Sequence, residues 1–148
     1  MFLRVFIRVV VNLVVVTLMW LGPGATARAQ HRAQDVREVI AAAKAAIGTR
    51  YKYGGANLRG FDCSGLTMWA WEHVGISLPH NARMQHRATD HVRRRHLERG
   101  DLVFFYRPIS HVGMYLGRGK MIHANHVGGS VRRSRVFWGH FSDGGRPE

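Results

Sequence analysis

The stretch "HVGMYLGRGKMIHAN", His111–Asn125, decides the fold, because two strand-like segments flank a short glycine turn. In the first segment Val112, Met114 and Leu116 alternate with the other residues, which is the two-residue period of a strand with one apolar face. The second segment, Lys120–Asn125, continues the alternation after the turn sequence GRG. This pattern predicts an antiparallel hairpin.

Further segments extend the pattern in both directions along the chain. "DLVFFY", Asp101–Tyr106, precedes the hairpin and "SVRRSRVF", Ser130–Phe137, follows it, and both resemble short strands. The N-terminal half instead shows helical spacing of apolar residues in Asp35–Thr49 and Cys63–Val74. Helices followed by an antiparallel meander indicate an α+β fold, with the N-terminal helices packed on an antiparallel β-sheet.

The hairpin carries two histidines, His111 and His123, inside its strands. If GRG forms a three-residue loop, Leu116 pairs with Lys120 and Gly113 faces His123. His111 then lies diagonally from His123 on the same face, about 7 Å away and within side-chain reach. A two-residue loop would place the two histidines on opposite faces. The odd loop therefore predicts a histidine pair.

Cys63 is the only cysteine in the chain, and it lies at the first turn of the predicted helix Cys63–Val74. Unpaired N–H groups and the helix dipole at this position favour a thiolate with a lowered pKa, and they could stabilise an oxyanion. We expect Gly65 to leave room for a substrate beside the thiol. Cys63 is then a nucleophile with His111 as base and His123 as the residue that orients it. The alternative is a buried structural cysteine and two strand histidines bonded to backbone.

Four further histidines lie in a basic segment between the predicted helix and the first strand: His80, His86, His91 and His96. They could form a metal cluster, but no carboxylate-rich or cysteine-rich set accompanies them in the sequence. The composition of this segment favours a solvated face. We therefore expect no metal ligands and no cofactor.

The N-terminus has the pattern of a secretory signal. Arg4 and Arg8 precede the apolar stretch Val9–Leu21, and the small-residue pattern A-x-A ends at Ala29. The apolar stretch is short for a membrane span of ~20 residues, although extending it back to Phe2 would permit an uncleaved anchor. We expect a signal peptide at residues 1–29 and one domain at residues 30–148, secreted or held in the cell envelope. Contact with the membrane would then be transient.

The 148 residues carry a net charge of +13, from 22 lysines and arginines against nine acidic residues. A surface this basic favours polyanionic partners: nucleic acid, anionic lipid or an anionic cell-wall polymer. An exported protein meets the wall polymer, so no nucleic acid partner is expected.

Six motifs in order carry a resemblance that spans about Asp35 to Val136: "YKYGG", "FDCSGL", "GISLPHNARMQ", "RGDLVFF", "SHVGMYLG" and "MIHA". The chain resembles the NlpC/P60 family of papain-like cell-wall cysteine peptidases. The resemblance implies a papain-like α+β fold. It also implies hydrolysis of the γ-D-glutamyl bond to a diamino acid in peptidoglycan stem peptides.

The resemblance also implies roles for individual residues. Cys63 matches the family's nucleophile, His111 its base and His123 its third polar residue. Three more residues match the positions beside the thiol and in the substrate pocket: Tyr51, Asp62 and Ser64. Ala82 stands where many members have a serine that helps to hold the D-glutamyl carboxylate.

Two other functions remain open at this point. One is a cell-wall amidase or acyltransferase on the same scaffold, and the other is a non-catalytic module that binds polyanions or cell wall. Members of the family often carry separate wall-binding modules, and we expect none within these residues, so the basic surface itself is the candidate for binding anionic wall polymers.

Overall fold

The computed structural model describes residues 23–148, and within it Asp35–Glu148 form one compact unit. The stretch up to Gln34 belongs to a second unit, whose described part is the beginning of helix α2 (Pro23–Ala45). The signal peptide expected at residues 1–29 therefore lies mostly outside the described residues. In the part of the chain that the structure describes, no helix is long and apolar enough to cross a membrane.

Two further helices follow α2. Helix α3 (Cys63–Glu72) begins at the N-cap Asp62 and is two residues shorter than predicted, and Gly75 beyond its end adopts a positive φ of 77°. Helix α4 (Ala82–Arg87) begins at the N-cap Asn81. A small sheet of β1 (Ala56–Asn57) and β2 (Gly60–Phe61) lies in the loop before α3.

A six-stranded sheet has the order β3-β8-β4-β5-β6-β7, and its paired neighbours are antiparallel. The strands are β3 (Asp90–Val92), β4 (Leu102–Phe105), β5 (His111–Gly117), β6 (Lys120–Asn125), β7 (Ser130–Arg135) and β8 (Phe141–Arg146). Three short 3-10 helices connect them: η1 (Arg94–His96), η2 (His126–Gly128) and η3 (Trp138–His140). Strands β4 to β7 correspond to the four predicted strands, so the α+β fold is confirmed, whereas β3 and β8 were not predicted.

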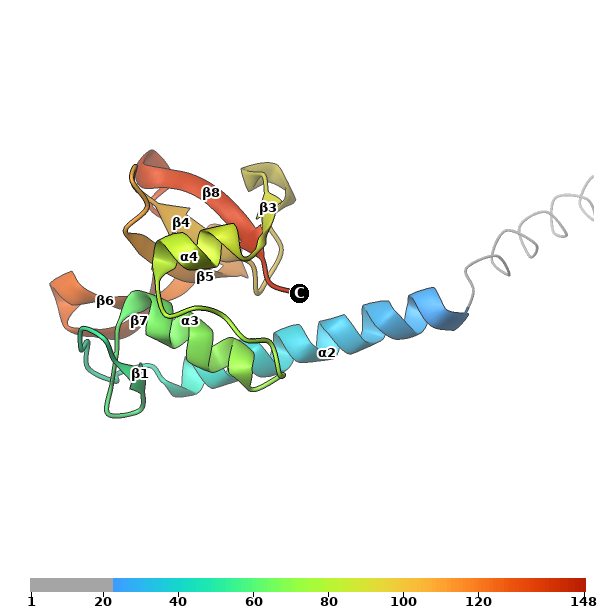
Figure 1. Ribbon diagram of the computed structural model, residues 1–148, viewed down its shortest axis with the longest axis horizontal. Helices are drawn as coiled ribbons and strands as arrows, with labels where there is room; N and C mark the ends of the chain where they lie inside the picture. The colour runs from blue at the N-terminus through green and yellow to red at the C-terminus, as the bar shows by residue number, and fades with distance from the viewer. Residues whose placement is uncertain (1–22) are drawn as a thin grey trace, which may run out of the picture. The chain divides into compact units, whose positions relative to one another are not determined.

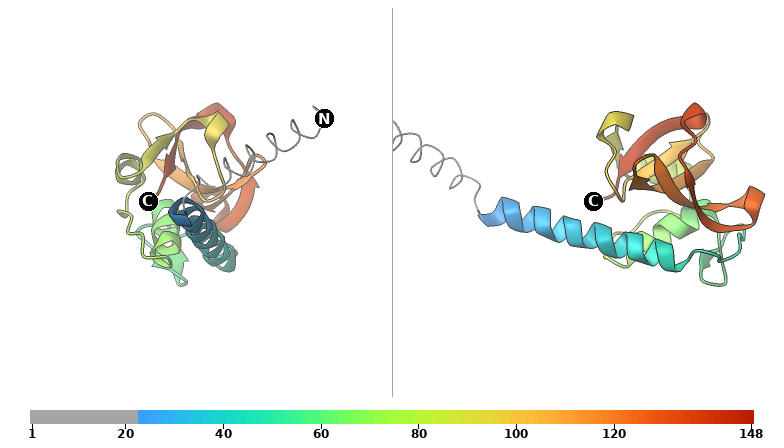
Figure 2. Two further views of the ribbon diagram at one scale, coloured as in Figure 1. Left: turned by 90° about the vertical axis from the view of Figure 1, so that its right-hand side faces the viewer. Right: turned by 180° about the vertical axis from the view of Figure 1, so that it is seen from behind.

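Both faces of the sheet are covered by apolar side chains. Helix α3 packs on β5 and β6, and Figures 1 and 2 show the helices gathered on one side of the sheet. On this side Leu66 and Trp71 of α3 join Phe104 and Val112 in the main core. The other side has its own smaller core, whose buried members are Val103, Phe105, Met121 and Val136. This double coverage explains why all four residues of β4 are buried.

The β5–β6 hairpin has nearly the predicted register. Met114 pairs with Ile122 and Tyr115 with Met121, as a three-residue loop requires near the histidines. At the turn, however, Lys120 pairs with Gly117 instead of Leu116, and a bulge between Tyr115 and Gly117 takes up the extra residue. The bulge has the same effect on the register as the odd loop, so the predicted alignment of the histidine strands holds.

Candidate active site

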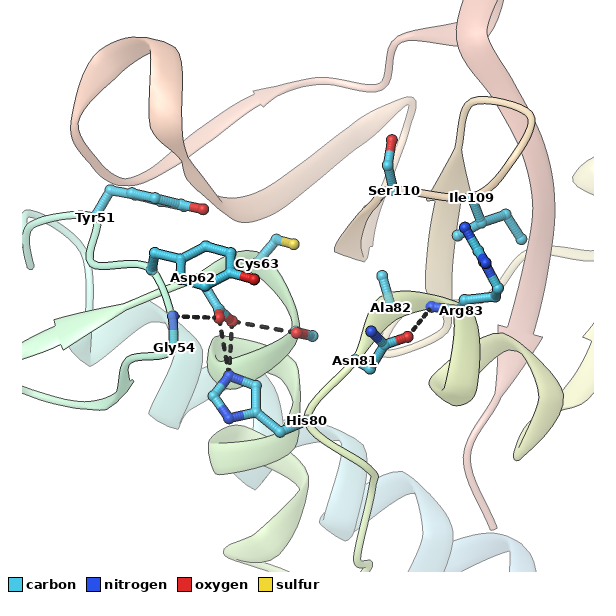
Figure 3. A pocket seen from close by; sticks show the side chains of 12 residues that line it. Tyr51, Gly54, Asp62, Cys63, His80, Asn81, Ala82, Arg83, Ile109 and Ser110 are labelled. Atoms are coloured by element: carbon cyan, nitrogen blue, oxygen red, sulfur yellow. Dashed lines mark hydrogen bonds and ion pairs between the residues drawn. The ribbon is translucent and has the colours of Figure 1, made fainter.

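Cys63 is the first residue of α3, and the carboxylate of Asp62 fixes this helix start (Figure 3). The backbone N–H of Gly65 donates to Asp62 Oδ1 at 2.7 Å, and that of Gly54 donates to Oδ2 at 2.9 Å. The Nε2 atom of His80 lies 2.9 and 3.0 Å from the two oxygens, and the Ser64 hydroxyl donates to Oδ1 at 3.2 Å. Asp62 thus ties the loop, the helix and the following segment together beneath the thiol.

A glycine is needed at position 65 for a different reason from the one expected. A Cβ atom on this residue would lie 2.0 Å from the carbonyl oxygen of Gly55 and 2.9 Å from His80 Nε2. The absence of a side chain therefore permits close packing of the loop on α3, and the expectation that Gly65 makes room for substrate is wrong.

Two pockets meet at Cys63. The larger, of about 460 Å³, extends towards Asp62, His80 and the first turn of α4, where Asn81 and Arg83 line it (Figure 3). The smaller, of about 320 Å³, extends towards the two histidine strands and η2, and its lining includes His111, Asn125 and His126. Tyr51, Cys63 and Ser110 line both pockets. A chain of substrate atoms could therefore cross the thiol with one part in each pocket.

The two strand histidines are in direct contact. His111 Nε2 lies 2.8 Å from His123 Nδ1, and the rings meet edge to face with centroids 5.1 Å apart. The predicted histidine pair is therefore present. On its other side, His123 Nε2 lies 3.1 Å from the hydroxyl oxygen of Ser134 in β7. No sequence pattern indicated Ser134, because its place diagonal to His123 depends on the register between β6 and β7, in which Ser134 pairs with Met121.

The hydrogen-bond chain defines which ring nitrogens carry protons. The hydroxyl of Ser134 donates to the backbone carbonyl of Arg135 at 3.1 Å, so its oxygen accepts from His123 Nε2–H. His123 Nδ1 is then an acceptor, and His111 Nε2–H donates to it. This arrangement leaves the lone pair of His111 on Nδ1, the nitrogen that the chain does not use.

Burial keeps this site electrically neutral. It lowers the pKa of His111 to about 4, with the charge of His126 contributing, and it lowers the pKa of the fully buried His123 to about 3. Burial also raises the pKa of the Cys63 thiol, with the Asp62 charge adding to it, against the lowering effect of backbone N–H groups. The expected lowering of the Cys63 pKa is therefore wrong, because desolvation outweighs the helix start.

The other residues singled out from the sequence also lie at the thiol. Tyr51, Asp62 and Ser64 line the larger pocket together with Cys63. Burial raises the pKa of the Tyr51 hydroxyl, with the Cys63 and Asp62 charges adding to the effect, so it stays a proton donor. Asn81 and Arg83, which flank Ala82 in the motif GISLPHNARMQ, also line this pocket, and so does Ser110, which the sequence did not mark as a candidate.

The expectation of a solvated histidine face is wrong for His80 and His86. His80 contacts Asp62, as described, and His86 Nε2 lies 3.0 Å from Asp143 Oδ2. His91 contacts the same Asp143 oxygen, at 2.5 Å from its Nδ1. In the sequence, no carboxylate-rich set accompanies these histidines. Asp143 lies in β8, more than fifty positions after His86 and His91, so no local pattern could indicate it. His96 is exposed, as expected.

Residues 48–143 match the model of the NlpC/P60 family. The chain belongs to the NlpC/P60 family. The matched range contains Cys63, His111 and His123, and it covers the compact unit except for its two ends. The resemblance read from the six motifs is therefore confirmed.

Curated relatives are about two fifths identical to this chain over aligned stretches of about 100 residues. "Probable endopeptidase Rv2190c" of Mycobacterium tuberculosis is 42% identical over 98 residues, which are 66% of this chain and 26% of the relative. "Bifunctional muramidase/DL-endopeptidase CwlT" of Bacillus subtilis is 44% identical over 102 residues, 65% of this chain and 30% of the relative. The chain thus spans between about a fifth and a half of the length of the curated relatives that it matches.

Solved NlpC/P60 structures share the fold. The peptidoglycan hydrolase RipB from Mycobacterium tuberculosis superposes with a TM-score of 0.75 at 34% identity, covering 84% of this chain and 71% of RipB. The P60 domain of antigen MAP1204 from M. avium subspecies paratuberculosis gives a TM-score of 0.73 at 32% identity, covering 79% of this chain and 96% of the domain. The likeness extends over most of residues 35–148, which carry the site.

Proposed function

We propose that this protein is a cysteine endopeptidase that hydrolyses the γ-D-glutamyl bond to a diamino acid in peptidoglycan stem peptides. The observation that carries the proposal is Cys63 at the junction of two pockets, one of which also contains the base candidate His111. The names of two relatives, the peptidoglycan hydrolase RipB and the DL-endopeptidase CwlT, support this substrate class.

In the proposed mechanism the thiol and the imidazole are both neutral before reaction. His111 Nδ1 takes the proton of Cys63 as the sulfur attacks the γ-glutamyl carbonyl carbon, and His123 accepts from His111 Nε2–H so that the ring stays oriented. Backbone N–H groups at the start of α3 and the Tyr51 hydroxyl stabilise the oxyanion. The imidazolium protonates the leaving amine, and water, activated by the same ring, then releases the acyl-enzyme.

The larger pocket is the candidate site for the acyl part of the substrate. Asp62 lies on one side of it, and Asn81 and Arg83 lie on the other, where Ala82 replaces the serine of many family members (Figure 3). Ser64 also lines this pocket. Arg83 provides a positive charge for the D-glutamyl carboxylate. The smaller pocket then accepts the diamino acid.

Digestion of purified cell wall tests the proposal. The unmodified protein should release muropeptides cut between D-glutamate and the diamino acid, and Cys63→Ala should release none while its circular dichroism spectrum is unchanged. His111→Ala should be nearly as severe, and the double variant should be no worse, because the two residues act as a unit.

Product masses distinguish the alternatives. Release of an intact stem peptide from the glycan would identify an amidase, and transfer of the acyl group to an added amine would identify an acyltransferase. Unchanged wall, with binding to it retained, would identify a non-catalytic binding module.

The place of action follows from the same proposal. A substrate in the cell wall requires export, for which residues 1–29 provide the signal-like pattern. The net charge of +10 that residues 30–148 carry, which is +13 less the three arginines of residues 1–29, supports binding to anionic wall polymers, which would concentrate the protein at its substrate.

A further inference from the structure

Three side chains from three separate elements converge on one point away from the two pockets. His86 lies in the last turn of α4, His91 in β3 and Asp143 in β8. One ligand atom from each lies within 4.8 Å of the others. His86 Nε2 and His91 Nδ1 both approach Oδ2 of Asp143, at 3.0 and 2.5 Å.

Packing fixes two of the three side chains and leaves the third adjustable. The His86 side chain is 21% exposed, and its ring meets Phe104 edge to face with centroids 5.1 Å apart. Asp143 is 29% exposed, and its Oδ1 atom accepts the backbone N–H of Gly144 at 2.9 Å. The His91 side chain is 64% exposed. The cluster therefore has an apolar wall on one side and access to solvent on the other.

Asp143 presents one carboxylate oxygen, Oδ2, to a nitrogen of each histidine ring. Two imidazoles facing one carboxylate form a ligand set that suits zinc and similar divalent transition metals.

We propose that His86, His91 and Asp143 bind one divalent transition-metal ion of the zinc class. Tetrahedral coordination with bonds of about 2.0–2.1 Å places ligand atoms about 3.3 Å apart. The two separations from Asp143 Oδ2 are hydrogen-bond distances, and the two histidine nitrogens lie within 4.8 Å of each other, so movements of about 1–1.5 Å, chiefly of the exposed His91 ring, admit the ion. Each imidazole binds through the nitrogen that now donates to Asp143. The proton on that nitrogen passes to solvent while the other ring nitrogen carries a proton, and water completes the coordination shell.

The ion has a structural consequence for the proposed active site. Helix α4 has only six residues, and its first turn, with Ala82 and Arg83, lines the larger pocket beside Cys63. A metal at His86 in its last turn anchors this helix to β8. The ion should therefore stabilise the fold and the pocket wall, and it takes no part in the thiol chemistry.

Zinc titration of the full chain tests the site, in a Cys63→Ala background so that the thiol cannot bind the ion. Competition with a chromogenic chelator should show one zinc per chain, and zinc should raise the melting temperature. His91→Gln and Asp143→Asn should each weaken binding by at least about tenfold. His96→Gln, which changes an exposed histidine of the same segment, is the matched control and should bind like the background protein.

The result that overturns the proposal is zinc affinity unchanged in His91→Gln, or absence of binding at millimolar zinc. In either case the three side chains are only a hydrogen-bonded cluster that links α4, β3 and β8. If Asp143→Asn fails to fold, His91→Gln still decides, because its ring is largely exposed. In the unmodified protein, chelator treatment should lower the melting temperature and leave turnover of a small stem peptide unchanged.

Discussion

Replacing the single residue His123 tests how much the orientation of the His111 ring contributes to activity, because His123 itself does not react with the substrate. We expect His123→Ala to lower kcat roughly 10–1000-fold, because His111 then loses the acceptor for its Nε2–H but keeps its lone pair. His123→Asn should retain more activity than alanine, since an acceptor oxygen remains. Single-turnover kinetics on a stem peptide measures both effects.

Ser134→Ala is the matched test of the hydrogen-bond chain. The serine lies beyond His123 and reaches neither the thiol nor the pockets, so its removal should lower kcat by roughly tenfold or less and leave KM unchanged. If His123→Ala is as active as the unmodified enzyme, another residue must orient the His111 ring. Asn125, which lines the smaller pocket, is then the first candidate.

The pH profile follows from the neutral thiol–imidazole pair. As the pH falls through about 4, His111 becomes protonated and cannot accept the thiol proton, so kcat/KM should fall there and not near the usual histidine value of 6.5. Because the pKa of Cys63 is raised above 9.0, the profile should stay flat from about pH 5 to pH 8. Measurement of kcat/KM from pH 3 to pH 9 checks both limits.

A control variant tests the cause of that low acid limit. The charge of the exposed His126 contributes to the low pKa of His111, so His126→Gln should move the acid limb to higher pH. The position of the limb is the readout, since His126 also lines the smaller pocket. An acid limb near pH 6.5 in the unmodified protein would contradict the lowered pKa of His111. Loss of activity above neutral pH would indicate a thiolate–imidazolium pair, since the imidazolium then loses its proton.

At the scale of elements, Asp62 holds the start of α3 to its surroundings. Asp62→Ala removes the acceptor for two backbone N–H groups and for His80, so it should lower the free energy of unfolding by about 1–3 kcal/mol. Asn81→Ala removes the N-cap of the short α4 and should cost about 1 kcal/mol. Urea denaturation compares the two, and a smaller loss for Asp62 than for Asn81 would contradict this assignment.

Elements with their own periodicity could be predicted from the sequence, and those defined by distant pairing could not. The alternation in His111–Asn125 predicted β5 and β6, and with them the histidine pair. Strand β8 has the sequence FSDGGR, which has little apolar alternation. It is a strand because β3 and β4 pair with it on both sides.

The same limit applies to the site. Cys63 and Asp62 lie at a helix start that the sequence marks, whereas the partners of Asp62 and Asp143 come from other elements. The predicted lowering of the Cys63 pKa was wrong for a related reason. The helix start, which lowers the pKa, is visible in the sequence, but the burial that raises it depends on tertiary packing.

At the scale of the whole molecule, the basic surface has a defined focus at η1. Arg93, Arg94 and Arg95 are exposed and line a hollow with Tyr115 and Trp138. The Arg94 guanidinium lies 4.0 Å from the centre of the Trp138 ring, which leaves its edge free for an anion. This cluster of three arginines is the candidate contact for anionic wall polymers.

Salt should therefore separate wall binding from chemistry. The Debye length falls from about 8 Å at physiological salt to about 3 Å at 1 M, which screens exposed arginines far more than a thiol in a pocket. Raising salt should strongly reduce activity on intact wall and only slightly reduce activity on a soluble stem peptide. Neutralising Arg93, Arg94 and Arg95 together to glutamine should reproduce the salt effect on wall and leave the peptide rate unchanged.

The control for the triple variant at η1 removes three positive charges from other exposed positions. Arg118, Arg133 and Arg135 are also exposed, so their joint change to glutamine tests whether net charge alone matters. If the η1 cluster is a specific contact, this second triple variant should retain most of its activity on wall. Equal losses in the two variants would show that only the overall charge, +10 for residues 30–148, attracts the polymer. A ratio of wall to peptide activity that stays flat with salt would mean that the basic surface has another partner, with nucleic acid and anionic lipid vesicles the next to test.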